Sequence, residues 1–128
     1  VCSSDLPLRK AKDIELGIKS LKKGISTVIS VNKSNFPPQF YFSKNKNNVL
    51  KPVYKNTPLI KSETRVQNIS DSFRPNGAFY ISNIKKLIKN KNFFKGKILG
   101  VEMPAKRSID IDTIDDLKLA RYFFKKKI

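Results

Sequence analysis

Two aspartates one residue apart are the strongest candidates for chemistry in this chain. Asp110 and Asp112 alternate with Ile109 and Ile111, in a sequence with 10 acidic residues against 27 basic ones. If this stretch is extended, its period of two puts both isoleucines on one face and both carboxylates on the other. Two hard oxygen ligands on one face suit Mg²⁺, which completes its shell with waters and phosphate oxygens. The spacing is therefore compatible with a magnesium site at Asp110 and Asp112.

The same acids also have a purely structural interpretation. Asp112 could be the N-cap of a helix that starts at Thr113, with Asp115 at the third helical position. Capping requires Asp112 alone and leaves Asp110 without a role. From the spacing alone, both interpretations stay open.

A second motif upstream adds information. RPNGAFYI at Arg74–Ile81 leads from a polar turn into a strand-forming run, and SIDIDTIDDLKLA follows at Ser108–Ala120. Together these two motifs resemble the acylneuraminate cytidylyltransferases, also called CMP-sialic acid synthetases. The resemblance runs from about Pro7 to Phe124. Shorter matches in the family's order are PLR at 7–9, NFF at 92–94 and EMP at 102–104.

The resemblance implies an activity and a set of site residues. Family members transfer CMP from CTP to the anomeric hydroxyl of sialic acid or a related nonulosonic acid, releasing pyrophosphate. By motif, Asp110 and Asp112 match the family's Mg²⁺-binding aspartates. Arg74 and Asn76 match its motif beside the sugar pocket, although Asn76 could equally be a residue of a turn. Arg65 stands where a family arginine meets the acidic nine-carbon sugar.

The resemblance also implies a fold and an assembly. The family has a Rossmann-like nucleotide-diphospho-sugar transferase fold and forms homodimers through an extension that matches residues 37–60. Its glycine- and lysine-rich loop for the CTP triphosphate has no counterpart here. We therefore expect residues 7–128 to be the C-terminal part of one cytidylyltransferase domain, inactive by itself. Residues 1–6, VCSSDL, match the translation of a sequencing-adapter end, and we expect them to be non-native read-through.

Net charge offers alternative functions. The chain carries +17 and a pI near 10.1, as basic nucleic-acid-binding modules do. Its lysines are scattered among asparagines and not clustered with arginines and aromatic platforms, so we expect no nucleic-acid partner. A non-catalytic dimerisation domain is a further alternative. One cysteine, no visible signal peptide and no long apolar run predict a cytoplasmic protein without a membrane partner.

Alternating helical and strand patterns predict an α/β protein. We expect helices at 10–23, 83–90 and 113–125, and strands at 25–31, 49–54, 78–81 and 97–101. Loops are expected at 35–43, leading into a further strand, and at 57–72. The inner face of the first helix is predicted to be Ile14, Ile18 and Leu21, and that of the last helix Ile114, Leu117, Ala120 and Phe124.

Overall fold

The computed structural model describes residues 1–62, 64–65 and 69–126. The chain divides into two compact units, Val1–Asn32 with Arg74–Ile128, and Lys33–Phe73. Helices and sheets alternate along the chain, which confirms the predicted α/β class. No helix among the described residues is long and apolar enough to cross a membrane.

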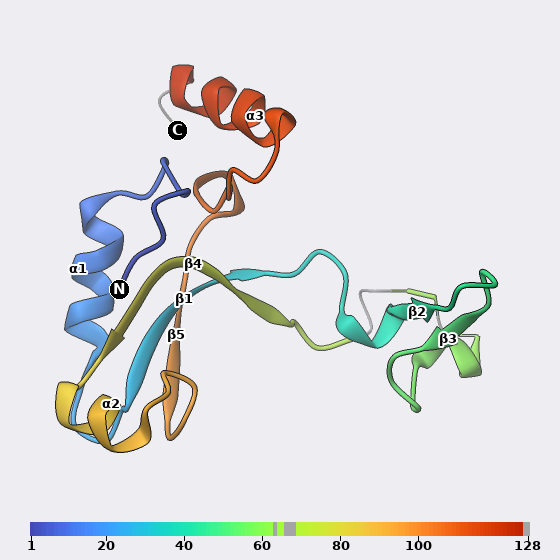
Figure 1. The fold of residues 1–128 in the computed structure, drawn as a ribbon, viewed down its shortest axis with the longest axis horizontal. Helices are drawn as coiled ribbons and strands as arrows, with labels where there is room; N and C mark the ends of the chain where they lie inside the picture. Colours follow the sequence, from blue (N-terminus) through green and yellow to red (C-terminus); the bar gives the residue numbers. More distant parts are fainter. Residues whose placement is uncertain (63, 66–68, 127–128) are drawn as a thin grey trace. The chain divides into compact units, whose positions relative to one another are not determined.

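A three-stranded sheet forms the centre of the first unit. Strand β1 (Thr27–Lys33) lies between β4 (Phe73–Ser82) and β5 (Ile98–Glu102), as Figure 1 shows. β1 and β5 are parallel. β4 runs antiparallel to β1, because Ser26 lies opposite Asn83 while Ser30, further along β1, bonds Phe79, which precedes Asn83. β1 is buried from Thr27 to Asn32, as expected for a central strand rich in β-branched residues.

Helix α1 (Ala11–Ser20) packs closely against this sheet through a glycine. A Cβ atom on Gly17 would lie 2.6 Å from a ring carbon of Phe79, which is fully buried. The buried residues of α1 are Asp13 and Gly17. Of the predicted inner face, Ile14 and Leu21 pack against the core as expected, whereas Ile18 is 59% exposed and was wrong. The core of the unit consists of Leu6, Val28, Ala78, Phe79, Val101 and Met103.

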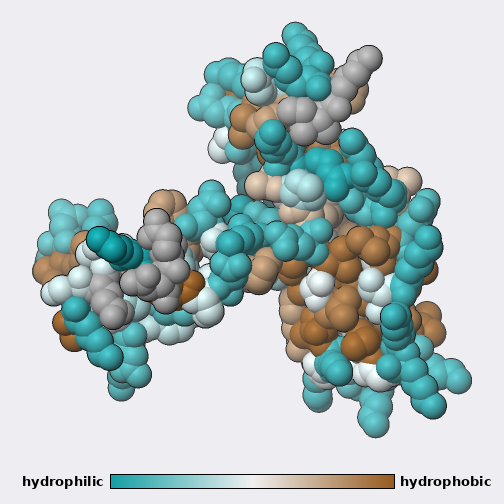
Figure 2. Space-filling view, turned by 180° about the vertical axis from the view of Figure 1, so that it is seen from behind, coloured by the Kyte–Doolittle hydropathy of each residue, from teal (hydrophilic) through white to brown (hydrophobic). Residues whose placement is uncertain are grey.

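Apolar side chains also reach the surface of this unit, where they appear brown in Figure 2. A groove of about 330 Å³ lies there, and Ile14, Ile81 and Leu87 are among its lining residues. Leu87 belongs to helix α2 (Ile84–Asn90), which begins after its N-cap Asn83, close to the predicted bounds.

Residues 1–6 lie beside the outer edge of β4. Val1 and Tyr80 exchange backbone hydrogen bonds, and the Ser3 N–H donates to the Gly77 carbonyl at 3.1 Å. Leu6 is 2% exposed and belongs to the core. The non-native origin of this segment stays a prediction, since it concerns the coding DNA.

The second unit is a small hairpin with short turns. Strands β2 (Phe42–Lys44) and β3 (Leu50–Pro52) pair antiparallel. The side chain of Asn45 accepts from the N–H groups of Asn47 and Val49 and closes the turn between the two strands. Short 3₁₀ helices flank the hairpin, η1 (Pro38–Phe40) and η2 (Pro58–Lys61). η2 lies inside the predicted loop 57–72, of which residues 63 and 66–68 are outside the described part.

Candidate active site

The candidate site lies where the chain leaves β5. Met103 is 1% exposed, and its N–H donates to the Val31 carbonyl at 2.8 Å, so the chain is anchored at the end of β1. A 3₁₀ turn, η4 (Ala105–Arg107), follows, and residues 108–112 then lead to helix α3 (Ile114–Lys125). β1 and β5 are parallel, and open α/β sheets bind ligands outside the carboxyl ends of such strands. Asp110 and Asp112 are thus in a position suited to ligand binding.

The predicted alternation of isoleucines and carboxylates is seen in the burial of this segment. Ile109 and Ile111 are partly buried, whereas Asp110 and Asp112 are exposed. The Ile111 N–H donates to the Asp5 carbonyl at 3.1 Å, which fixes the middle of the segment. Both carboxylates therefore face solvent, where a cation could retain its waters.

The electrostatic surroundings of Asp110 are acidic. Desolvation raises the pKa of Asp110 from its ordinary value, and repulsion from Asp5, Asp112 and Asp116 raises this pKa further. The positive charge of Arg74 acts in the opposite direction. A bound cation would relieve this repulsion, so the local charge favours one.

The donor set fits Mg²⁺ better than a fully caged ion. Among the described residues, no group of three or more His, Cys, Asp or Glu side chains is placed to hold a metal. A pair of exposed carboxylates is what Mg²⁺ commonly takes from a protein, since waters and substrate phosphates supply its other ligands. Asp110 and Asp112 could provide such a pair.

The cap of α3 is Thr113, and the predicted capping by Asp112 was wrong. The Thr113 hydroxyl accepts from the Asp116 N–H at 3.2 Å, and one Asp116 carboxylate oxygen accepts from the Thr113 N–H at 2.8 Å. The third helical position is therefore Asp116 and not Asp115. The Thr113 hydroxyl also donates to Asp116, and these bonds lower the pKa of that carboxyl. Asp112 is thus left outside the capping box.

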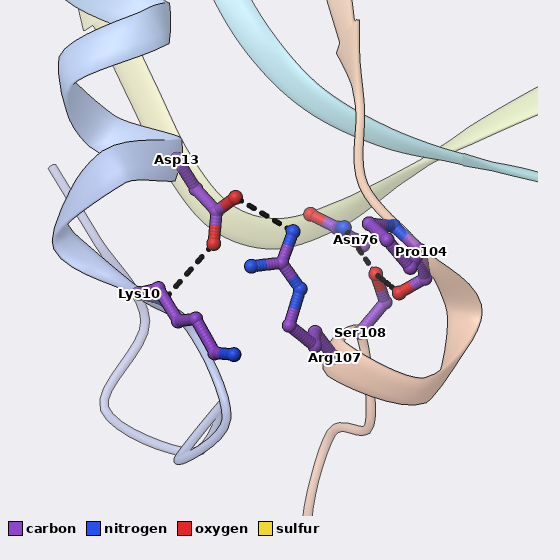
Figure 3. Close-up of polar contacts among 6 residues, drawn as sticks. All are labelled: Lys10, Asp13, Asn76, Pro104, Arg107 and Ser108. Atoms are coloured by element: carbon purple, nitrogen blue, oxygen red, sulfur yellow. Dashed lines mark hydrogen bonds and ion pairs between the residues drawn. The ribbon is translucent and has the colours of Figure 1, made fainter. Parts of the chain in front are cut away.

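Asn76 lies within β4, directly before Gly77 with its positive φ of 77°, and it makes both the local contact of a turn residue and a contact with another element. Its amide nitrogen donates to the Ser108 hydroxyl at 2.8 Å, and its oxygen accepts from the Ala78 N–H at 3.1 Å. The Ser108 hydroxyl in turn donates to the Pro104 carbonyl at 3.1 Å. The side chain of Asn76 is 9% exposed. Its bond to Ser108 links β4 to the segment before Asp110 (Figure 3).

The two predicted arginines have different positions. Arg74 lies on β4 and is exposed, and its charge acts on the Asp110 carboxyl. Arg65 is also exposed but belongs to the second unit. Within the first unit, the structure brings together Asp110, Asp112 and Arg74.

A buried ion pair beside this site was not predicted. Arg107 Nη2 lies 2.9 Å from Asp13 Oδ1, and the two side chains are 11% and 8% exposed. The other oxygen of Asp13 accepts from the Lys10 N–H at the start of α1. The available sequence signal was Asp13 itself, an acid next to Ile14 in a helix predicted to pack on the sheet.

Comparison with known proteins gives a partial match. The chain is 36% identical over 52 residues to N-acylneuraminate cytidylyltransferases of Streptococcus agalactiae serotypes III, Ia and V. The matched stretch covers 41% of this chain and 13% of each relative. No family model matches the chain.

Proposed function

We propose that this chain is part of a cytidylyltransferase that transfers CMP from CTP to sialic acid or a related nonulosonic acid. The observation that carries the proposal is the pair Asp110 and Asp112, exposed beyond the carboxyl ends of two parallel strands with Arg74 in electrostatic reach. The partial similarity to N-acylneuraminate cytidylyltransferases supports the same reaction. The corresponding fold would be the Rossmann-like nucleotide-diphospho-sugar transferase fold.

Each site residue has a distinct part in this proposal. Asp110 and Asp112 would hold Mg²⁺, which when bound neutralises phosphate charge and orients the reacting oxygens. Arg74 presents an exposed guanidinium beside the two carboxylates, and its planar fork suits the carboxylate or phosphate of a substrate. We assign Arg65 to the sugar carboxylate. Asn76 would support the sugar-binding side indirectly, because its amide nitrogen donates to the Ser108 hydroxyl.

The second unit is proposed to form a homodimer with a second copy of the chain. All six residues of β2 and β3 are exposed, and a two-stranded hairpin alone is marginally stable in water. Large apolar side chains of the hairpin face solvent, among them Phe42 (42% exposed), Leu50 (56%) and Val53 (55%). An identical hairpin would cover this apolar surface.

A chimera tests the proposed reaction. The N-terminal part of the Streptococcus agalactiae enzyme, up to the position that aligns with Pro7, would be fused ahead of Pro7, so that a nucleotide-binding part is supplied. With CTP, Mg²⁺ and sialic acid, the chimera should release pyrophosphate. Asp110→Asn should lower that rate by at least about 100-fold.

The matched control is Asp115→Asn, which removes the same charge from an exposed pair with Lys118 at 2.8 Å. It should leave the rate within a few-fold of the parent chimera. A folded chimera with no pyrophosphate release, or one in which Asp110→Asn and Asp115→Asn behave alike, would contradict the proposed function.

A further inference from the structure

Two polar contacts attach the segment before Asp110 to two different elements. Arg107 reaches Asp13 on α1, and the neighbouring Ser108 accepts from Asn76 on β4 (Figure 3). Asp110 follows Ser108 by two residues, so the path of the backbone into Asp110 is set by both contacts. The two anchors are distant in sequence, since Asp13 and Arg107 are 94 positions apart and Asn76 and Ser108 are 32 positions apart.

The contact between Asp13 and Arg107 is costly for the fold. Both charges are almost entirely removed from water, and within the described residues the second terminal nitrogen of Arg107, Nη1, is buried with no hydrogen-bond partner. Buried ion pairs contribute little net stability, because desolvation offsets most of the attraction. A buried donor without a partner adds a further cost. Net stabilisation therefore does not explain why this pair is present. Fixing the position of η4 relative to α1 would explain it.

We propose that Asp13 and Arg107 are positioning residues for the carboxylates of Asp110 and Asp112. Their ion pair holds the start of segment 107–112 against the first turn of α1. Arg107 is suited to this task because its planar guanidinium defines an orientation as well as a charge. The inference rests on the proposed function, since it takes Asp110 and Asp112 as the cation ligands.

Two variants separate this role from general stability. Asp13→Asn keeps an oxygen for the Lys10 N–H and removes the charge that pairs with Arg107. Arg107→Lys keeps a positive charge near Asp13 and removes the planar fork. The matched control is Asp71→Asn, which breaks an exposed pair with Lys33 at 2.7 Å.

The first measurement is amide hydrogen exchange in the 128-residue chain without metal. The Ile111 N–H bonds the Asp5 carbonyl and reports on the positioned segment, whereas the amides of β1 report on the whole unit. In Asp13→Asn the acceleration at the Ile111 amide should exceed that of the β1 amides by about tenfold, because β1 reports only the general cost of leaving Arg107 buried without its partner, whereas Ile111 also reports local opening. Arg107→Lys should give a smaller increase.

The second measurement is Mn²⁺ binding, followed by water-proton relaxation, with Mn²⁺ as a paramagnetic substitute for Mg²⁺. Loss of a residue that orients metal ligands commonly costs 10–100-fold in affinity, so Asp13→Asn should bind about tenfold more weakly than wild type. The Mn²⁺ affinity of Arg107→Lys should lie between those of Asp13→Asn and wild type, and the affinity of Asp71→Asn should equal that of wild type.

Several outcomes would overturn the inference. Unchanged Mn²⁺ affinity and Ile111 exchange in both folded variants would remove the positioning role while leaving the cation site in place. Equal acceleration at Ile111 and throughout β1 would reduce the pair to a general stabilising contact. If Asp13→Asn does not fold, Arg107→Lys decides by the same criteria. Absence of Mn²⁺ binding in wild type would overturn the cation site and this inference together.

Discussion

Asp110 combines an unfavourable charge environment with an exposed position, as a ligand-binding residue often does. Three neighbouring carboxylates, those of Asp5, Asp112 and Asp116, raise its pKa in addition to desolvation, and Arg74 only partly compensates. Residues selected for binding commonly lower stability in the unbound protein. The repulsion from Asp112 and Asp116, which lie outside the segment expected to be non-native, is therefore consistent with the proposed cation site.

Desolvation and this repulsion make the stability difference between wild type and Asp110→Asn depend on pH, because both raise the pKa of Asp110. Because the pKa is raised in the folded state, ionisation of Asp110 lowers the free energy of unfolding. This cost is absent below the pKa of the unfolded state and complete above the pKa of the folded state. Asp110→Asn should therefore be slightly more stable than wild type at pH 7, by less than about 1 kcal/mol because the group is largely exposed. The difference should vanish in acid, below the ordinary aspartate pKa of about 3.9.

Urea unfolding of both chains at pH 7 and at pH 3, without divalent metal, measures the effect. Asp71→Asn serves as the control, because Asp71 lies in an exposed ion pair of the second unit. A wild type that is more stable than Asp110→Asn at pH 7 would show that Asp110 makes a favourable contact instead.

Among the elements, α1 depends on close approach to the sheet at Gly17. A methyl group there would meet the ring of Phe79 at 2.6 Å, and that ring is fully buried and cannot move aside. Gly17→Ala should destabilise the chain by about 1–3 kcal/mol despite the better helix propensity of alanine. Thermal unfolding should show the loss. Leu16→Ala, at an exposed neighbouring position, should have a much smaller effect, and equal effects would contradict the packing argument.

At the start of helix α3, Thr113 is the N-cap, whereas the preceding residue Asp112 takes no part in the cap. Thr113→Ala should cost about 1 kcal/mol by removing the cap, whereas Asp112→Ala should cost much less. The bond from the Thr113 hydroxyl is the largest cause of the lowered pKa of Asp116. The stability that this bond contributes is therefore lost as the pH falls through the pKa of Asp116 in the folded state. Thr113→Ala should weaken this acid dependence. The reverse ranking of the two variants in urea unfolding would restore Asp112 as the cap.

Local patterns predicted most elements but not the contacts that join them. The strand at 25–31 and the short helix after Asn83 followed from residue types within a few positions. The buried face of α1 followed only in part: Ile14 and Leu21 pack against the core as predicted, whereas Asp13 is buried against Arg107, which is 94 residues away. The bond from the Ala78 N–H to Asn76 fits the turn alternative, but the bond of Asn76 to Ser108 could not be predicted because Ser108 lies on another element. The exposure of Ile114 (69%) and Phe124 (74%) also departs from the helical pattern.

For the whole molecule, the proposed homodimer depends on the exposed hairpin of the second unit. A dimer through β2 and β3 should be weakened at least about tenfold by Leu50→Glu, because a charge would be buried in an apolar contact. Asn47→Glu adds the same charge at the exposed turn and should leave the dimer intact. Sedimentation measures dimer formation by both variants and by wild type. A salt concentration of about 0.15 M screens the repulsion between copies that each carry a net charge of +17. A monomeric wild type, or equal effects of the two variants, would remove the proposed dimer.

The central claim is that Asp110 and Asp112 form one divalent-cation site. Its most direct test is Mn²⁺ binding to the 128-residue chain, measured by water-proton relaxation and competed with Mg²⁺. Wild type should bind one Mn²⁺ that Mg²⁺ displaces, Asp110→Asn and Asp112→Asn should each lose most of the affinity, and Asp115→Asn should retain it. Equal binding by wild type and Asp110→Asn, or no binding by wild type, would contradict the claim.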